Sequence, residues 1–268
     1  GDVYKRQVLY NYNGEYKDVT KFTKNEMFEF RKKVQMVFQD PYSALNPQKK
    51  IYTSFEEPLK THGVSSVEER EKIMNRVLKM VNIQPDYLMR FPHEFSGGQR
   101  QRLCIARALE VTPEVLICDE PVSALDVSIQ AQVLNLMKEI QKEMNLTYLF
   151  IAHDLSVVQY MSDRIMVMYL GKIVEVADSK ALYDEPLHPY TKALISAIPV
   201  ADIHYKKKRQ VLEGEVPSPI HKPSGCAFHN RCPYCMDICK KEDPALRYHG
   251  ADGHMTACHL YDGSEVNA

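Results

Sequence analysis

Phe95-Ser-Gly-Gly-Gln-Arg-Gln-Arg102 and Val115-Leu-Ile-Cys-Asp-Glu-Pro-Val-Ser-Ala-Leu-Asp126 are two stretches separated by one short helical pattern. In the first stretch a Ser-Gly-Gly turn opens a helix, and the unpaired N–H groups of its first turn point toward one spot. In the second, an apolar run typical of a buried parallel strand ends in two carboxylates, Asp119 and Glu120. An anion-binding helix start together with a metal-binding acid and an adjacent base predicts hydrolysis of a nucleotide phosphate.

Strand patterns alternate with helix patterns on both sides of these stretches, which predicts an α/β fold with a mostly parallel sheet. Further along the chain, a hairpin with Gly171 in its turn is expected. Earlier in the chain, Ser65 and Glu68 form a predicted capping box for a helix that extends through Val81. The expected strands are 8–12, 34–38, 114–118 and 147–152, the hairpin spans 164–177, the expected helices are 25–33 and 128–145, a loop is expected at 41–47, and a helical insert covers about 43–108.

Composition places the chain among ordinary globular proteins. Its 268 residues are 44% hydrophobic and 26% charged, with a net charge of -1. This balance gives no electrostatic reason to expect a nucleic-acid partner. No apolar run approaches the roughly 20 residues that span a bilayer, and the N-terminus lacks a signal-peptide core, so a cytosolic protein is expected.

The start of the chain is unusual. It begins at Gly1 without an initiator Met, and no Gly-x-x-x-x-Gly-Lys-Ser/Thr phosphate loop occurs anywhere in the sequence. We therefore interpret the chain as N-terminally truncated, with residues 1–7 as foreign sequence. A split or degenerate gene is the alternative.

The two opening stretches resemble the signature loop and the Walker B strand of the ABC-transporter ATPases. The resemblance implies a P-loop NTPase (RecA-like) ABC ATPase core with a helical subdomain and a Cys-rich C-terminal extension. An acid at a strand end holds Mg²⁺ through its water shell, and a neighbouring carboxylate orients and deprotonates the attacking water. In the family, the position of Asp119 serves Mg²⁺ and that of Glu120 is the catalytic base.

In the same family the signature loop, here Ser96, Gly97, Gly98 and Gln99, binds the γ-phosphate of ATP held by the opposing subunit. Hydrolysis then requires a dimer, and Asp126 matches the D-loop acid that bridges the two nucleotide sites. Phe95 replaces the usual Leu of the motif. Read without the resemblance, Ser-Gly-Gly is a helix cap with a flexible entry.

Two further polar residues follow predicted strands. Gln39 precedes Asp-Pro, as in the family's Q-loop, whose amide reaches Mg²⁺ or the lytic water and which also contacts the membrane subunits. His153 matches the switch histidine that contacts the γ-phosphate. Each residue considered alone is more commonly structural, and the motifs around it favour the catalytic role.

Five of the seven cysteines lie between positions 226 and 258. Thiolates at such spacing bind a [4Fe–4S] cluster or Zn²⁺, the latter with help from His229 or His259, and reduced structural thiols are a third interpretation. In peptide-importer ATPases with this extension, four cysteines match Cys226, Cys232, Cys239 and Cys258, so the resemblance favours a [4Fe–4S] cluster there. Cys235 is additional to that pattern.

The resemblance extends from about Val8 to Cys258 and is most specific to the F-type ATP-binding subunit of dipeptide and oligopeptide importers. It rests on Asp40-Pro-Tyr-Ser-Ala-Leu-Asn-Pro47, on the run from Cys118 to Val133, and on Pro186-Leu-His-Pro-Tyr-Thr-Lys-Ala-Leu194 followed by the Cys-rich tail. It implies a nucleotide-binding domain at 1–198 and an extension at 199–268. The implied cofactors are ATP and Mg²⁺.

The implied partners are a D-type ATPase subunit, two membrane permeases and an extracytoplasmic peptide-binding protein, at the cytoplasmic face of a bacterial or archaeal membrane. Three alternatives remain open. One is a nickel or other small-solute importer of the same subfamily, because cargo does not follow from the ATPase. Another is a non-transport ABC ATPase acting on DNA or ribosomes, although the sequence shows no long coiled coil or tandem domain. The last is a non-hydrolysing binding module, because the phosphate loop is absent.

Overall fold

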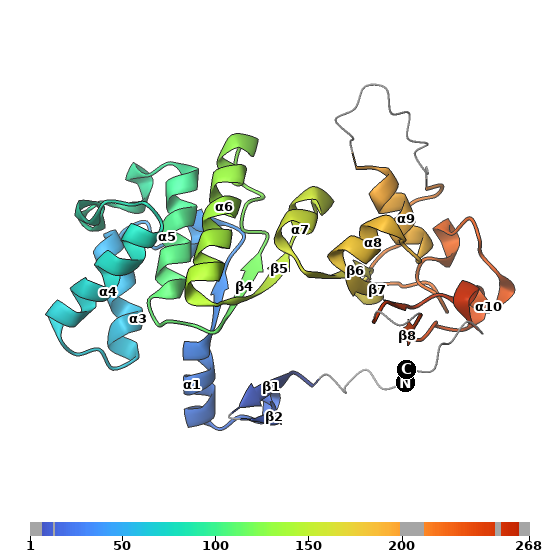
Figure 1. Cartoon of the computed structure of the whole chain (residues 1–268), viewed down its shortest axis with the longest axis horizontal. Helices are drawn as coiled ribbons and strands as arrows, with labels where there is room; N and C mark the ends of the chain where they lie inside the picture. The colour runs from blue at the N-terminus through green and yellow to red at the C-terminus, as the bar shows by residue number, and fades with distance from the viewer. Residues whose placement is uncertain (1–6, 13, 199–211, 250–252, 263–268) are drawn as a thin grey trace. The chain divides into compact units, whose positions relative to one another are not determined.

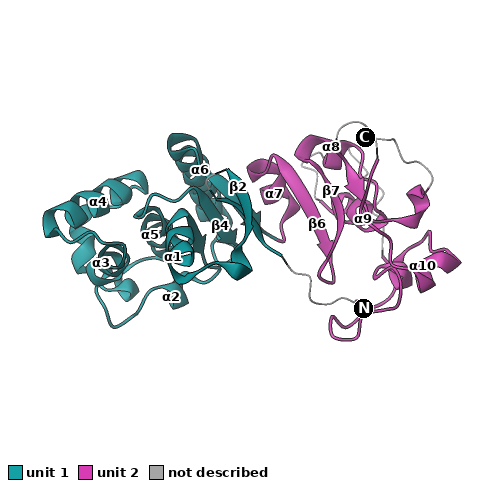
Figure 2. Cartoon of the chain, turned by 90° about the horizontal axis from the view of Figure 1, so that it is seen from below, with its two compact units in different colours: residues 1–152 teal, residues 153–268 magenta. Residues whose placement is uncertain are grey.

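The computed structural model describes residues 7–12, 14–198, 212–249 and 253–262. The chain divides into two compact units, residues 1–152 and residues 153–268 (Figure 2). The first unit contains β1 (Leu9–Tyr12), β2 (Glu15–Asp18), η1 (Val19–Lys21), α1 (Lys24–Lys33), β3 (Val34–Val37), α2 (Pro41–Ala44), α3 (Ile51–Thr61), α4 (Val67–Met80), η2 (Pro85–Met89), η3 (Pro92–Glu94), α5 (Gly97–Leu109), β4 (Val115–Asp119), α6 (Val127–Met144) and β5 (Thr147–Ile151).

The centre of the first unit is a parallel sheet in the order β3-β4-β5 (Figure 1). In one face, Val37 and Cys118 are buried at 1% and 0% exposure, and Tyr148 on this face donates a hydrogen bond from its hydroxyl to the Met137 carbonyl of α6. Burial raises the pKa of the Cys118 thiol to about 12. The expected parallel core is therefore confirmed.

The opposite face of the same sheet is apolar and open. Met36, Ile117 and Leu149 lie in register across the three strands, and Ile151 is the next residue of β5 on the same face, two positions after Leu149. Met36 is 36% exposed, Leu149 43% and Ile151 45%. Parallel sheets in α/β proteins are normally covered on both faces, so this side differs from the usual arrangement.

Between β3 and β4 the chain forms only helices and turns, and their grouping into a helical subdomain at about 43–108 stays a prediction. Two expectations in this region are wrong. Residues 41–44 form the short helix α2 rather than a loop, because the Asp40 carboxylate accepts from the N–H groups of Tyr42 and Ser43 and Pro41 fits the first helical position. Helix α4 is capped by Ser66, whose hydroxyl accepts from the Glu69 N–H, and not by Ser65 with Glu68.

The second unit contains α7 (Leu155–Met161), β6 (Arg164–Tyr169), β7 (Lys172–Asp178), α8 (Ser179–Asp184), α9 (Pro189–Ser196), η4 (His229–Arg231), α10 (Asp237–Lys241), β8 (Arg247–Tyr248), β9 (Met255–Thr256) and η5 (His259–Tyr261). The expected hairpin is present as β6 and β7, with Leu170 and Gly171 both at positive φ in the turn, as a tight hairpin needs. The tail adds β9 and β8 to form an antiparallel sheet in the order β6-β7-β9-β8. One face of β6 packs around Phe228, which is 1% exposed.

Candidate active site

Glu120 and Gln39, the predicted base and the predicted Q-loop amide, meet in the first unit. Gln39 Nε2 donates a 2.8 Å hydrogen bond to Glu120 Oε2, although the residues are 81 positions apart. They meet because β3 and β4 are parallel neighbours and both residues follow the carboxyl ends of their strands. The amide therefore lies where it can hold the carboxylate or the water that the carboxylate would activate.

Asp119 is the last residue of β4 and lies in register with Ile151 of β5. Its neighbour Glu120 has left the extended conformation, with φ at 42°. The pair therefore lies at the carboxyl edge of the sheet, where ligands of open α/β sheets bind. In the part of the chain that the structure describes, no group of three or more His, Cys, Asp or Glu side chains is placed to hold a metal ion directly. For Mg²⁺, which keeps much of its water shell, a single carboxylate at this edge fits.

Ser96 caps the start of α5, where the sequence predicts an anion site. The Ser96 hydroxyl accepts from the Gln99 N–H at 3.3 Å, and Gln99 Oε1 accepts from the Ser96 N–H at 3.0 Å. This capping box uses two of the donors at the helix start. For the N–H groups of Gly97 and Gly98, no acceptor is found within the described segments, and Ser96 is exposed. An anion therefore has access to them.

Packing against α6 also explains why position 98 is a glycine. A Cβ atom at this position would lie 2.5 Å from Ile129 Cγ2 of α6, and one at Gly97 would lie 3.5 Å from Leu125 Cδ2. The glycines thus let α6 and the preceding loop approach the start of α5. This places the D-loop, the residues that follow Glu120 and end at Asp126, beside the signature segment, residues 95–102.

The D-loop contains a hydrogen-bond arrangement that the sequence reasoning missed. Gln130, one turn into α6, donates from Nε2 to the carbonyls of Val122 at 3.0 Å and Leu125 at 2.9 Å. A Gln four residues after the Asp126 cap was the available signal, because it can reach back over the first helical turn. Asp126 itself is exposed and makes no side-chain cap hydrogen bond.

His153 follows β5 after one residue, Ala152, and is the first residue of the second unit. It is followed by Asp154, whose carboxylate caps α7 by accepting from the N–H groups of Ser156 and Val157. Its proposed contact with a γ-phosphate stays a prediction.

A groove of about 870 Å³ lies beside the Q-loop. It is lined by residues 42–47, by Ser54, Glu57, Pro58, Thr61 and His62 on and after α3, and by Arg107 of α5. Arg107 fixes the Q-loop side, donating from Nη1 to the Ala44 carbonyl at 2.7 Å. Burial is the main cause that lowers the pKa of His62, which leaves the ring neutral at neutral pH.

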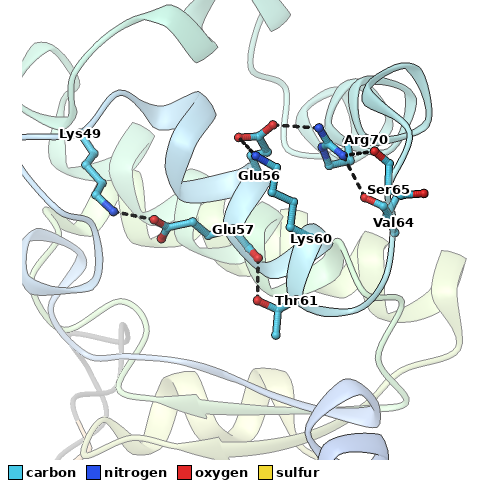
Figure 3. Close-up of polar contacts among 8 residues, drawn as sticks. All are labelled: Lys49, Glu56, Glu57, Lys60, Thr61, Val64, Ser65 and Arg70. Atoms are coloured by element: carbon cyan, nitrogen blue, oxygen red, sulfur yellow. Dashed lines mark hydrogen bonds and ion pairs between the residues drawn. The ribbon is translucent and has the colours of Figure 1, made fainter.

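Ion pairs brace the α3 wall of this groove (Figure 3). Glu57 contacts Lys49 at 2.5 Å. On the other side of α3, Glu56 contacts both Lys60 at 2.9 Å and the buried Arg70 of α4 at 3.0 Å. Arg70 also donates to the carbonyls of Val64 and Ser65, so one buried guanidinium ties α3, α4 and their connection together.

The four predicted cluster cysteines gather in the second unit. The Cys226 N–H donates to the Cys239 carbonyl at 2.8 Å, and Cys239 is buried. Burial is the first cause that raises the pKa of the Cys226, Cys232 and Cys258 thiols, the last to about 11, and repulsion among neighbouring thiolates adds to it. As placed, these thiols do not form a ligand set for a metal, and Cys235 lies among them.

The parallel sheet, the paired Gln39 and Glu120, and the capped glycine-rich helix start define a nucleotide-hydrolysing domain of the ABC type. A family model described as ABC transporter matches residues 7–123, and one described as oligopeptide/dipeptide transporter, C-terminal region, matches residues 174–239. The chain belongs to the ATP-binding subunits of oligopeptide and dipeptide ABC transporters, and its expected fold class and ATPase activity are those of this family.

Relatives and solved structures agree. The chain is 55% identical to the oligopeptide transport ATP-binding protein AppF of Bacillus subtilis, over 86% of this chain and 70% of that protein. It is 47% identical to the di/tripeptide transport ATP-binding protein DppF of Pseudomonas aeruginosa, over 88% of this chain and 73% of that protein. The structure of cbiO1 from Clostridium perfringens, part of the transporter complex cbiONQ, superposes with a TM-score of 0.56 at 27% identity, over 63% of this chain and 66% of that one.

A second solved structure is a dimer of the ATP-binding cassette MJ0796 in a post-hydrolysis state with ADP and phosphate. It gives a TM-score of 0.53 at 28% identity, over 63% of this chain and 72% of that one. ATPases of this type bind ATP with Mg²⁺, and peptide-importer ATPases work with membrane permeases and a binding protein. No helix among the described residues has the length and apolar character needed to cross a bilayer.

Proposed function

We propose that Glu120 is the general base of ATP hydrolysis in this energy-coupling subunit, and that Gln39 and His153 assist it. Asp119 would hold Mg²⁺ through water. The observation that carries the assignment is the 2.8 Å contact between Gln39 Nε2 and Glu120 Oε2 at the carboxyl edge of the sheet. Positioning the water and stabilising the transferring phosphate are the main catalytic effects in phosphoryl transfer.

The second part of the proposal concerns Ser96, Gly97, Gly98, Gln99 and Asp126. They would bind the ATP seated in a partner ATPase subunit of the D type. The support is the exposed helix start, where the Gly97 and Gly98 N–H groups have no acceptor among the described residues, and the D-loop beside it. ATP bound between two subunits would draw them together, and hydrolysis would release them.

The test uses the complete transporter that contains this chain. Glu120→Gln is expected to lower the turnover rate at least about 100-fold while ATP still binds, because a base is lost and the shape is kept. Glu139→Gln, at an exposed position of α6, is the matched control and should leave turnover unchanged. Robust hydrolysis by the Glu120 variant would refute the assignment.

We further propose that the groove beside the Q-loop receives a cytoplasmic helix of a permease, which places this subunit at the cytoplasmic face of the membrane. The groove joins the Q-loop to the braced α3, so a movement of Gln39 has a rigid element to act on. Thr61→Arg should fill the groove, abolish peptide transport and leave basal hydrolysis near its original rate. Normal transport by this variant would exclude the groove as the contact.

For organisation and cofactor, we propose a nucleotide-binding domain at 1–198, a transporter-specific extension at 199–268, and a [4Fe–4S] cluster on Cys226, Cys232, Cys239 and Cys258. The support for the cluster is the gathering of soft ligands; the thiols would have to turn toward a common centre. Iron, sulfide and zinc analysis of anaerobically purified protein tests it. Zinc alone, or no metal, would reject the cluster.

A further inference from the structure

The backbone at Glu120 is held in a conformation that L residues rarely adopt. Its φ is 42°, in the left-handed region, where a residue with a Cβ is disfavoured. Such a conformation persists only where surrounding contacts fix it. The direction of the Glu120 side chain, and so its contact with Gln39, depends on those contacts.

Contacts from both sides fix this backbone. The Glu120 N–H donates to the Ile151 carbonyl at the end of β5, at 3.0 Å. The Glu120 carbonyl accepts twice from Ser123, from its N–H at 3.2 Å and from its Oγ at 3.0 Å. Ser123 therefore fixes Glu120 only as long as the D-loop itself keeps its shape.

Gln130 is the side chain of α6 that fixes the D-loop from the other end. Its amide nitrogen uses both hydrogens, one to the Val122 carbonyl and one to the Leu125 carbonyl, so it brackets Ser123 on each side. Val122 is buried, and its carbonyl also accepts from the Leu125 N–H at 3.1 Å, so Gln130 adds a side-chain donor to a turn that the backbone already closes. Leu125 in turn lies next to Gly97 of the signature segment.

We propose that Gln130 is a positioning residue for hydrolysis: its amide sets the D-loop, the D-loop sets Ser123, and Ser123 sets the left-handed turn that aims Glu120. The same amide holds Leu125 at the start of α5, so one side chain orients the machinery for the chain's own nucleotide and for the partner's. The proposal rests on the proposed role of Glu120 as the base.

The test is Gln130→Met in the complete transporter, which keeps side-chain length and removes both donors. We expect kcat to fall about 10- to 100-fold while KM for ATP changes less than about threefold. A loss confined to kcat means that the substitution disturbs the transition state and leaves the binding of ATP nearly unchanged. Amide hydrogen exchange across residues 120–126 should become faster. The matched control is Gln132→Met, two residues further along α6 at an exposed position, where Gln132 accepts from Arg102.

A second variant distinguishes the loss of these hydrogen bonds from a general folding defect. Gln130→Arg restores N–H donors and should regain kcat to within about threefold of the original, with slow exchange restored. Faster exchange with unchanged kcat, unchanged exchange, or an equal loss in Gln132→Met would each overturn the proposal. If Glu120→Gln retains turnover while Gln130→Met loses it and loosens the loop, the base assignment falls and the positioning of the loop by Gln130 stands.

Discussion

Glu175 of β7 and His254 are 79 residues apart in sequence, and Glu175 Oε1 lies 2.7 Å from His254 Nε2. Glu175 is fully buried, and its carboxylate also accepts from the N–H groups of Leu187 and His188, just before α9. One buried carboxylate thus joins the hairpin, α9 and the Cys-rich tail within the second unit.

Removing that carboxylate should unfold the second unit more easily. Glu175→Ala leaves a buried imidazole and two N–H groups without their acceptor, so the free energy of unfolding should fall by about 3 kcal/mol. Glu185→Ala, at an exposed site close by, should change it by less than about 0.5 kcal/mol. Urea unfolding of both variants measures the difference, and equal midpoints would contradict the prediction.

Glu110, at the end of α5, should make stability fall as pH rises. It is 2% exposed, neither carboxylate oxygen has a hydrogen-bond partner among the described residues, and burial raises its pKa to about 9. The folded protein keeps the proton while the unfolded chain loses it above about pH 4.5. The stability lost therefore accumulates between these two values.

Glu110→Gln removes that titration. At pH 8 it should raise the free energy of unfolding by up to about 5 kcal/mol, and at pH 4 it should change it little. Chemical unfolding at both pH values measures the effect. A variant whose stability runs parallel to the original across this range would show that Glu110 is ionised when folded.

Gly225→Ala should disrupt the fold around the tail cysteines. The residue has φ of +66°, and an added Cβ would lie 2.5 Å from the Cys239 carbonyl oxygen. Gly253 has a similar φ of +68° with nothing within 4 Å, so Gly253→Ala measures the conformational cost alone, about 1 kcal/mol. Thermal unfolding should show a clearly larger loss for the first variant, and equal losses would mean that the backbone yields.

Gly98→Ala should couple to Ile129. The new methyl group would collide with Ile129 Cγ2, so the single variant should lose stability, and Ile129→Ala in the same chain should recover part of it. A double-mutant cycle by urea unfolding gives the interaction energy. Strict additivity would place the effect of Gly98 elsewhere than in packing.

Features set by neighbouring residues were predictable from the sequence. Ser96 with Gln99 specifies its own cap, and alternating apolar residues around Leu170 and Gly171 specify the hairpin. Where two local signals competed, the prediction was off by one residue, as at Ser66. The paired Gln39 and Glu120 could be anticipated only through the family motifs, because their contact depends on which strands become neighbours.

Pairings between residues far apart in the chain could not be predicted from the sequence. The addition of β9 to β7 joins Met255 to Val176, and the Glu175 contact with His254 depends on it. Nothing in a two-residue strand at positions 255–256 carries a recognisable period. Gln130 was missed for a related reason, because a glutamine near a helix start has no motif of its own and its acceptors appear only when the loop is folded.

The uncovered side of the β3-β4-β5 sheet has a practical consequence for anyone handling this polypeptide by itself. Met36, Leu149 and Ile151 form a contiguous hydrophobic patch that is exposed to solvent on this sheet. Surfaces of this kind adhere to each other, so light scattering should rise with protein concentration. Replacing Leu149 by Lys should keep the preparation monodisperse without touching the catalytic edge.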